Sequence, residues 1–271
     1  MIILNGINKE IFSIIKRFEE NGFRILSYID SLTHGIVVRH LVVLPAFNEE
    51  KSIGTVIREI KKSIPFADIL VVNDGSDDRT GSIGTGEGVI VVNHPFNLGY
   101  GAALQTGFRF AAKRGYDRVF TLDADGQHIP SSAKSLLDAM REQDADVVIG
   151  SRFIGGGYRV NAAKKVGIWF FSLIARIYTG INITDPTSGF QLLNRKAFSY
   201  LSEGDNYPLD YPDVNIIMVL HKRRFKIVET SVVMIENLHG KSMHSGLRPI
   251  AYVVKMFLAI IMVLVRGTRK K

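Results

Sequence analysis

Two aspartates, Asp123 and Asp125, stand two positions apart directly after a short apolar run at residues 119–122. In an extended segment, side chains two positions apart point the same way, so this pair can hold one divalent cation. Mg²⁺ takes one or two protein carboxylates and completes its shell with phosphate oxygens and water. Aspartates are also common in turns and helix caps. The position after a buried strand, with Gln127 and His128 adjacent, favours metal binding.

The pair belongs to a repeating pattern of apolar runs in the middle of the chain. The runs are short, rich in Val, Ile and Leu, and lack polar alternation, which is typical of strands buried on both faces. They lie at residues 41–44, 69–72, 89–92, 119–122 and 147–149. Apolar residues at helical spacing separate several of them, at 53–60, 99–114 and 131–143. This order predicts an α/β fold with a mostly parallel central sheet flanked by helices.

Polar residues follow four of the predicted strands. In parallel α/β sheets, ligands bind beyond the carboxyl ends of the strands. The polar clusters occupy residues 45–50, 73–78, 123–128 and 150–152. We therefore expect one shared site at one edge of the sheet. Within it, Asp74 either accepts hydrogen bonds from a base or ribose or only forms the turn of its Asp-Gly-Ser sequence.

The amino-acid composition excludes several kinds of site and indicates which kinds of partner the protein binds. The 271 residues are 46% hydrophobic, enough for one large α/β domain with appendages. The absence of cysteine excludes disulfides, iron–sulfur clusters and cysteine nucleophiles, and it fits a reducing compartment. The net charge of +8 favours an anionic partner: a phosphorylated ligand, nucleic acid or an acidic membrane surface. Nucleic acid is disfavoured, because the aromatic residues are not interleaved with Arg and Lys as stacking platforms.

Two common nucleotide-binding loops are missing. The third glycine of a dinucleotide fingerprint that starts at Gly99 would fall at Leu104, which argues against a nicotinamide cofactor. The sequence Gly-Lys-Ser at 240–242 lacks the upstream glycine of a phosphate-binding loop.

The two ends of the chain have different patterns. Residues 8–20 predict an amphipathic helix, and we assign no role to residues 1–40. Residues 250–265 are strongly apolar, but Lys255 leaves only 256–265 uninterrupted, too short to span a bilayer. The basic residues 266–271 follow, which favours a helix on an anionic membrane surface. The alternative is a helix in the core or in an oligomer interface.

Seven motifs in chain order resemble those of the family 2 glycosyltransferases with the GT-A fold. The branch that they resemble is that of the dolichyl-phosphate mannose or glucose synthases, which act on polyprenyl phosphates. The motifs occupy residues 44–50, 71–77, 97–103, 122–128, 150–153, 185–190 and 240–242. The resemblance covers about residues 40–265, and we expect an N-terminal extension (1–40), a GT-A catalytic domain (41–245) and a membrane-associating C-terminal segment (246–271).

The resemblance also implies a set of donor-binding residues. The nucleotide and its diphosphate would lie against Pro45, Phe47, Glu49, Val72, Asp74, Asp123, Ala124 and Asp125. By the same resemblance, Asp125 and Gln127 would ligate Mg²⁺ or Mn²⁺, and Asp123 would help to position the donor. Arg152 and Lys241 would neutralise phosphate.

The chain departs from the family pattern late in the sequence. Asn237 stands where relatives often have an arginine that clamps phosphate, so Arg223, Arg224 or Arg248 is a candidate replacement. Asp213 stands where a glutamate is common, which leaves its role open.

The implied reaction is an inverting transfer of a sugar from a nucleotide-diphosphate sugar to undecaprenyl or dolichyl phosphate. A lipid phosphate is already largely anionic at neutral pH and needs little help from a base. A saccharide hydroxyl would need one, and Asp185 and Asp213 are the candidates. We therefore take Asp123, Asp125, Arg152, Asp185 and Asp213 as the predicted catalytic residues.

Two other functions are open from the sequence. One is transfer to a saccharide hydroxyl in cell-envelope polysaccharide synthesis, and the other is a catalytically inactive GT-A scaffold. For the leading function the expected location is peripheral, on the cytoplasmic face of the membrane. A small membrane protein or a second copy of the chain is a candidate partner.

Overall fold

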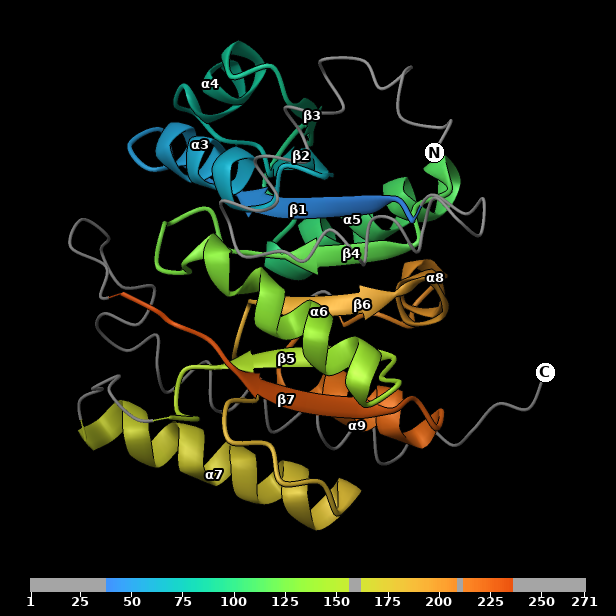
Figure 1. The fold of residues 1–271 in the computed structure, drawn as a ribbon. Coiled ribbons are helices and arrows are strands. Elements are labelled where there is room, and N and C mark those ends of the chain that lie inside the picture. The colour runs from blue at the N-terminus through green and yellow to red at the C-terminus, as the bar shows by residue number, and fades with distance from the viewer. Residues whose placement is uncertain (1–37, 156–161, 209–211, 236–271) are drawn as a thin grey trace, which may run out of the picture.

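The computed structural model describes residues 38–155, 162–208 and 212–235, and these form one seven-stranded sheet in the order β3-β2-β1-β4-β6-β5-β7 (Figure 1). The strands are β1 (His40–Ala46), β2 (Ala67–Asn73), β3 (Ile90–Asn93), β4 (Arg118–Thr121), β5 (Val147–Ser151), β6 (Gln191–Asn194) and β7 (Ile227–Ser231). Neighbouring strands are parallel except at β6, which runs antiparallel to both β4 and β5. The carboxyl ends of the six parallel strands therefore share one edge, and β6 begins there.

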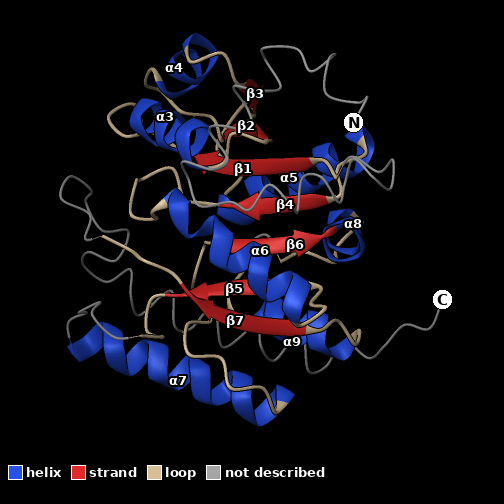
Figure 2. Ribbon diagram, viewed as in Figure 1, coloured by secondary structure: helices blue, strands red, loops and turns tan. Residues whose placement is uncertain are grey.

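Helices cover both faces of this sheet (Figure 2). The helical elements are α3 (Ile53–Ser63), α4 (Thr80–Gly86), α5 (Tyr100–Arg114), the short η1 (Pro130–Ser132), α6 (Ala133–Glu142), α7 (Ala162–Thr179), α8 (Arg195–Ser202) and α9 (Val214–Lys222). One hydrophobic cluster joins α3 and α6 to the sheet, and the other joins α5, α8 and α9 to it. Helix α7 packs on α9 through a separate small cluster.

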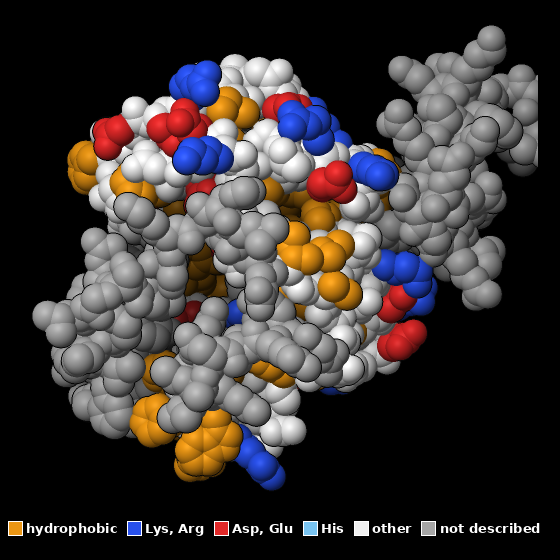
Figure 3. Space-filling view, turned by 90° about the vertical axis from the view of Figure 1, so that its left-hand side faces the viewer, with side chains coloured by type: hydrophobic (Ala, Val, Ile, Leu, Met, Phe, Trp, Pro, Cys, Tyr) orange, Lys and Arg blue, Asp and Glu red, His pale blue; other side chains and the backbone are white. Residues whose placement is uncertain are grey.

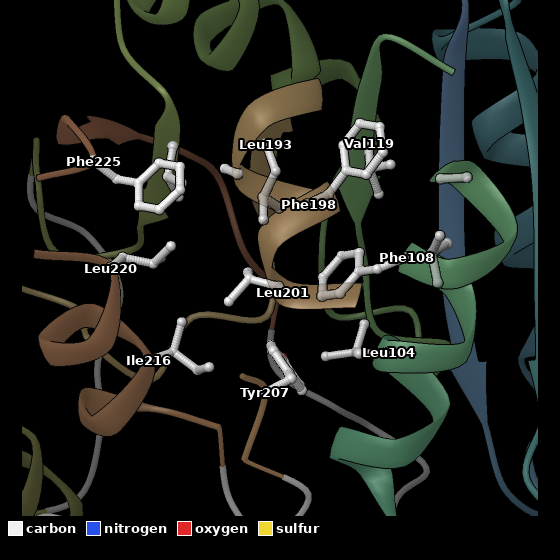
Figure 4. Close-up of a cluster of buried hydrophobic side chains, with 14 of the residues drawn as sticks. Leu104, Phe108, Val119, Leu193, Phe198, Leu201, Tyr207, Ile216, Leu220 and Phe225 are labelled. Atoms are coloured by element: carbon white, nitrogen blue, oxygen red, sulfur yellow. The ribbon is translucent and has the colours of Figure 1, made fainter. Parts of the chain in front are cut away.

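Side chains alternate between these two cores along β1. Val42 and Leu44 belong to the cluster under α3 and α6, whereas Leu41 and Val43 belong to the other, and all four are fully buried. This two-sided burial explains why the strand is continuously apolar. On the second face, side chains from α5, α8 and α9 meet around Leu201 (Figure 4).

The predicted α/β fold with a mostly parallel sheet is confirmed, and β1 to β5 coincide with the five predicted strands. The expectation of burial on both faces is wrong for β3. This strand lies at the edge of the sheet, where Ile90 is exposed. Strands β6 and β7 were not predicted, because residues 192–193 and 227–228 are their only apolar pairs.

The predicted terminal helices, at residues 8–20 and 250–265, lie outside the described residues. Among the helices that the structure does describe, none is long and apolar enough to cross a membrane.

Asp146 connects the strands of the antiparallel half at their far edge. Its Oδ1 accepts a hydrogen bond from Asn194 Nδ2 at 2.9 Å, and its Oδ2 accepts one from the backbone N–H of Lys226 at 2.8 Å. Partial burial opposes ionisation, but these hydrogen bonds and the nearby Lys196 ammonium outweigh it and lower the pKa of Asp146.

We expect Asp146→Asn to lower the free energy of unfolding by about 1–3 kcal/mol at neutral pH, because it removes a charged acceptor from two donors. A carboxyl whose pKa is lowered by folding contributes stability above its unfolded value of about 3.9. That contribution is lost as the pH falls through the folded-state pKa, so the difference between the two proteins should shrink in acid. Urea unfolding of wild type and variant at neutral pH and in acid measures this difference, and Asp144→Asn, at an exposed position, is the control. Equal losses in the two variants would contradict the assignment.

Candidate active site

The loops after β1 and β2 are joined to each other at the carboxyl edge. The backbone N–H of Asp74 donates to the carbonyl of Ala46 at 2.8 Å, and that of Asn48 donates to Ser76 Oγ at 2.9 Å. Gly75 has a φ of +70°, and a Cβ there would lie 2.4 Å from the backbone carbonyl carbon of Phe96. Only glycine therefore fits this turn.

The Asp74 carboxylate is fully engaged by the protein. Its Oδ1 accepts hydrogen bonds from the backbone N–H of Leu98 at 2.9 Å and from His94 Nδ1 at 2.7 Å. Its Oδ2 accepts a hydrogen bond from the backbone N–H of Gly99 at 2.8 Å. Thr106 Oγ1 lies 2.9 Å from the other ring nitrogen of His94. Asp74 is buried and holds the loop that leads into α5. This geometry favours the turn-forming alternative over direct contact with a base.

Asp123, just beyond β4, is held by two side chains, Tyr100 and His128. Tyr100 Oη donates to its Oδ1 at 2.8 Å, and His128 Nε2 donates to its Oδ2 at 3.1 Å. A Cβ on Gly189 would lie 2.5 Å from the carboxylate, so the absence of a side chain makes room for Asp123. Burial opposes ionisation, but the hydrogen bonds and the Arg152 charge outweigh it and lower the pKa of Asp123.

Asp125 and Gln127, the predicted metal ligands, are adjacent. The backbone N–H and the Nε2 of Gln127 donate to the two carboxylate oxygens of Asp125 at 2.9 and 2.6 Å. Burial and the negative charge of Asp123 raise the pKa of Asp125. Burial, followed by the charges of Asp125 and Asp123, also raises the pKa of Glu49, although a hydrogen bond from Ser52 opposes it.

These residues fit a divalent cation, because burial and neighbouring negative charge disfavour the ionised forms of Glu49 and Asp125, and a cation would relieve that repulsion. Across the described ranges, no group of three or more His, Asp or Glu side chains is placed to hold a metal by itself. A Mg²⁺ or Mn²⁺ ion held by Asp125 and Gln127 would complete its shell with phosphate and water.

Arg152 and Asp185 form a buried ion pair beyond β5. Arg152 Nε lies 2.5 Å from Asp185 Oδ2 and Nη2 lies 2.9 Å from Oδ1, with the two residues 8% and 0% exposed. The backbone N–H of Asp185 donates to Glu229 Oε1 at 2.7 Å. A general base must reach the acceptor's proton. Because both Asp185 oxygens face the guanidinium, the geometry favours a positioning role for Asp185 over that of a base.

Asp213 precedes α9 at the same edge and is half-buried. Desolvation, followed by the charge of Asp123 and, as a smaller contribution, that of Asp213, raises the pKa of Tyr100. Burial and Asp213 likewise raise the pKa of Tyr207. The assignment of Asp213 as a base stays a prediction.

The remaining predicted donor residues differ in accessibility. The side chains of Pro45 and Val72 are buried and pair in register across β1 and β2, and Ala124 is buried beside the aspartates. Phe47 is exposed at this edge. Lys241, together with Asn237 and Arg248, lies outside the described residues.

The suggestion that Arg223 or Arg224 replaces the missing phosphate clamp is wrong. Helix α9 starts at the carboxyl edge, and the two arginines follow its far end, just before β7 begins at the opposite edge. There Arg223 Nε donates to Tyr200 Oη at 3.2 Å.

Tyr100, which donates to Asp123, and Gly189, which leaves room for its carboxylate, were not singled out from the sequence. Both lie inside motifs quoted for the family resemblance, at 97–103 and 185–190, so the motif positions were the available signal. The edge that they share faces the viewer in Figure 3, where acidic and basic side chains lie recessed among hydrophobic ones.

Comparison with known proteins agrees with this architecture. The chain is 33% identical over 224 residues to the undecaprenyl-phosphate mannosyltransferase of Micrococcus luteus, an alignment that covers 77% of this chain and 88% of that protein. It is 30% identical over 223 residues to the polyprenol monophosphomannose synthase of Mycolicibacterium smegmatis, covering 77% and 82%.

The fold is similar to that of glucosyl-3-phosphoglycerate synthase from Mycobacterium tuberculosis, in a crystal structure with Mn²⁺, uridine diphosphate and phosphoglyceric acid. The TM-score is 0.65 at 17% identity, and the match covers 86% of this chain and 80% of that chain. The central sheet thus has the GT-A form. The family described as glycosyl transferase family 2 matches residues 41–201, and the chain belongs to that family.

Proposed function

We propose that this glycosyltransferase moves a hexose from a nucleotide-diphosphate sugar to a polyprenyl phosphate at the surface of a membrane. The observation that carries the proposal is the gathering of Glu49, Asp123 and Asp125 at the carboxyl edge, with Arg152 close enough to affect Asp123. The names of the two bacterial relatives, which specify undecaprenyl and polyprenol phosphates, support the choice of acceptor.

The chain's own residues have distinct tasks in this reaction. A bound Mg²⁺ or Mn²⁺ would supply positive charge to the diphosphate leaving group. Asp125 and Gln127 would hold it, and the Mn²⁺ in the structures of the mycobacterial synthase is consistent with this. Asp123, fixed by Tyr100 and His128, orients the donor sugar. Arg152, fixed by Asp185, adds positive charge where negative charge develops.

The acceptor determines whether a base is needed. A lipid phosphate attacks as an anion, so the reaction proceeds without proton removal by the protein. A saccharide hydroxyl is the second candidate acceptor. For this acceptor, the half-buried Asp213 that precedes α9 is the candidate base that would take the hydroxyl proton.

Membrane association completes the proposal. A polyprenyl phosphate is embedded in a bilayer, and the net charge of +8 attracts the chain to an anionic surface. Residues 246–271, with their apolar run and basic tail, are proposed to lie on that surface. The expected location is the cytoplasmic face.

Transfer assays test the proposal directly. The protein is incubated with radiolabelled GDP-mannose, UDP-glucose or UDP-N-acetylglucosamine, with Mn²⁺ and either undecaprenyl phosphate or oligosaccharide acceptors. We expect a labelled product that extracts into organic solvent. A labelled glycan without any lipid product would favour the hydroxyl acceptor, and no transfer with any donor would support the inactive scaffold.

Asp125→Ala should abolish Mn²⁺-dependent donor binding and lower kcat/KM by at least about a hundredfold, because it removes a carboxylate beside the leaving group. Calorimetric titration of the donor with and without Mn²⁺ and the transfer assay check this. Chelation of the metal in the wild-type protein should have the same effect. The half-buried Asp138→Ala on α6 is the matched control, and donor binding that survives in Asp125→Ala would refute the metal assignment.

Gly189→Ala should leave the protein folded but greatly reduce transfer, because the new methyl group would displace the Asp123 carboxylate. We expect a loss of at least about tenfold in kcat. Gly86→Ala, where nothing lies within 4 Å of the added Cβ, is the control and should retain activity. Full activity of Gly189→Ala with an unchanged melting temperature would show that the position of Asp123 does not matter.

The variant Asp185→Asn distinguishes two roles of Asp185, the orientation of Arg152 and general base catalysis. If Asp185 orients Arg152, its neutralisation removes the carboxylate charge opposite the buried guanidinium and lowers the free energy of unfolding by about 3–5 kcal/mol. Donor KM should rise, and the pH dependence of kcat should keep its shape. Chemical unfolding and a pH series check these expectations. Unchanged stability together with the loss of the ionisation from the kcat profile would instead identify Asp185 as the base.

A further inference from the structure

Helix α7 carries an exposed apolar face, which we define as Trp169, Leu173 and Ile177. These residues are spaced by four and are 63%, 37% and 77% exposed. Residues four apart lie on one side of a helix. The opposite side of α7 is also apolar, and there Phe171 and Ala175 pack against α9. The helix is therefore hydrophobic both toward the protein and away from it.

An outward-facing group of large apolar side chains indicates a binding surface more often than scattered single residues do. Figure 3 shows hydrophobic side chains together with a basic one at the lower end of the molecule, where Figure 1 places α7. Tryptophan in particular is enriched where proteins meet the headgroup region of bilayers.

Charge selects the partner of this face. The eighteen residues of α7 include two lysines and Arg176 and no acidic residue. Arg176 is exposed beside Ile177. This composition complements an anionic lipid surface, to which the whole chain is attracted by its net charge of +8. A second copy of the chain would bring the same cations against each other.

The face is connected to the proposed active site by a short path. Ser172 Oγ donates to the carbonyl of Thr184 at 3.3 Å, and Thr184 precedes Asp185, the partner of Arg152. Glu229 accepts hydrogen bonds from the backbone N–H groups of both Thr184 and Asp185. Helix α7 thus packs directly on the segment that orients Arg152.

We propose that the Trp169–Leu173–Ile177 face of α7 inserts into the headgroup region of an anionic bilayer. Docking through this face would bring the carboxyl edge of the sheet next to the lipid surface, where a polyprenyl phosphate presents its phosphate. The role of docking in access to the acceptor rests on the proposed function, whereas the docking itself does not.

The chain contains a single tryptophan, so Trp169 reports on this face without labelling. The full chain is titrated with vesicles of phosphatidylglycerol and phosphatidylcholine while tryptophan emission is recorded. We expect a shift to shorter wavelength and quenching by brominated acyl chains. Vesicles of phosphatidylcholine alone, or high salt, should weaken the binding by about tenfold or more.

Ile177→Glu places a negative charge on the face at a highly exposed position and should weaken vesicle binding by about tenfold or more. Leu173→Gln is a second variant that adds no charge. Ile90→Glu, on the edge strand β3 at the other end of the sheet, is the matched control and should bind as the wild type does. Thermal melting confirms that each variant is folded.

Two results would overturn the docking proposal. One is vesicle binding without any change in Trp169 emission, which would assign the contact to another segment such as residues 246–271. The other is emission already at short wavelength without lipid, which would mean that a second copy or residues 250–265 cover the face. Sedimentation velocity distinguishes these two occupants.

A transfer assay separates this proposal from the proposed function. Ile177→Glu should lose transfer to an acceptor embedded in vesicles and keep transfer to a short-chain polyprenyl phosphate in detergent. Equal activity of wild type and variant on the embedded acceptor would overturn the link between docking and acceptor access. If no form of the protein transfers sugar, the proposed function fails and the vesicle titration still decides on docking.

Discussion

The reversed direction of β6 is the constraint on which the active edge depends. Because β6 runs antiparallel between β4 and β5, the segment before it enters the sheet at the edge where its neighbours end. That segment brings Asp185 against Arg152 and Gly189 against Asp123. A parallel strand in the same place would deliver its preceding residues to the opposite edge, and both contacts would be lost.

The Arg152–Asp185 pair is costly to bury, and its surroundings show how the protein compensates. The free energy that is lost when two charges leave water is offset only when the pair has good geometry and additional hydrogen bonds. Here the contact is bidentate, and Thr187 Oγ1 lies 3.2 Å from Arg152 Nη2 as a further acceptor. Behind the pair, Glu229 fixes the backbone of Asp185. The result is a guanidinium held in place, whose charge adds to the effects of His128 and Tyr100 in lowering the pKa of Asp123.

The sequence was sufficient to predict the parallel half of the sheet, because strands buried on both faces leave continuous apolar runs such as residues 41–44. It predicted the gathering of Asp74, Asp123, Asp125 and Arg152 for the same reason, since parallel strands end at one edge. It did not predict the four-residue β6, whose direction depends on pairing with β4 and β5 rather than on local pattern. Without β6, the roles of Gly189 and Asp185 could not be separated from those of ordinary turn residues. Likewise, no local pattern indicates that Arg223 lies at the end of α9 that is remote from the active edge.

The engagement of Asp74 affects how negative charge is distributed around α5. The start of a helix carries a partial positive charge and unpaired N–H groups, which attract anions. Helix α5 starts at the carboxyl edge, yet the N–H groups of Leu98 and Gly99 that precede it are already bonded to a fixed aspartate. The protein thus supplies its own anion at this helix start. An anion that approached this end of α5 would therefore be repelled by the Asp74 carboxylate.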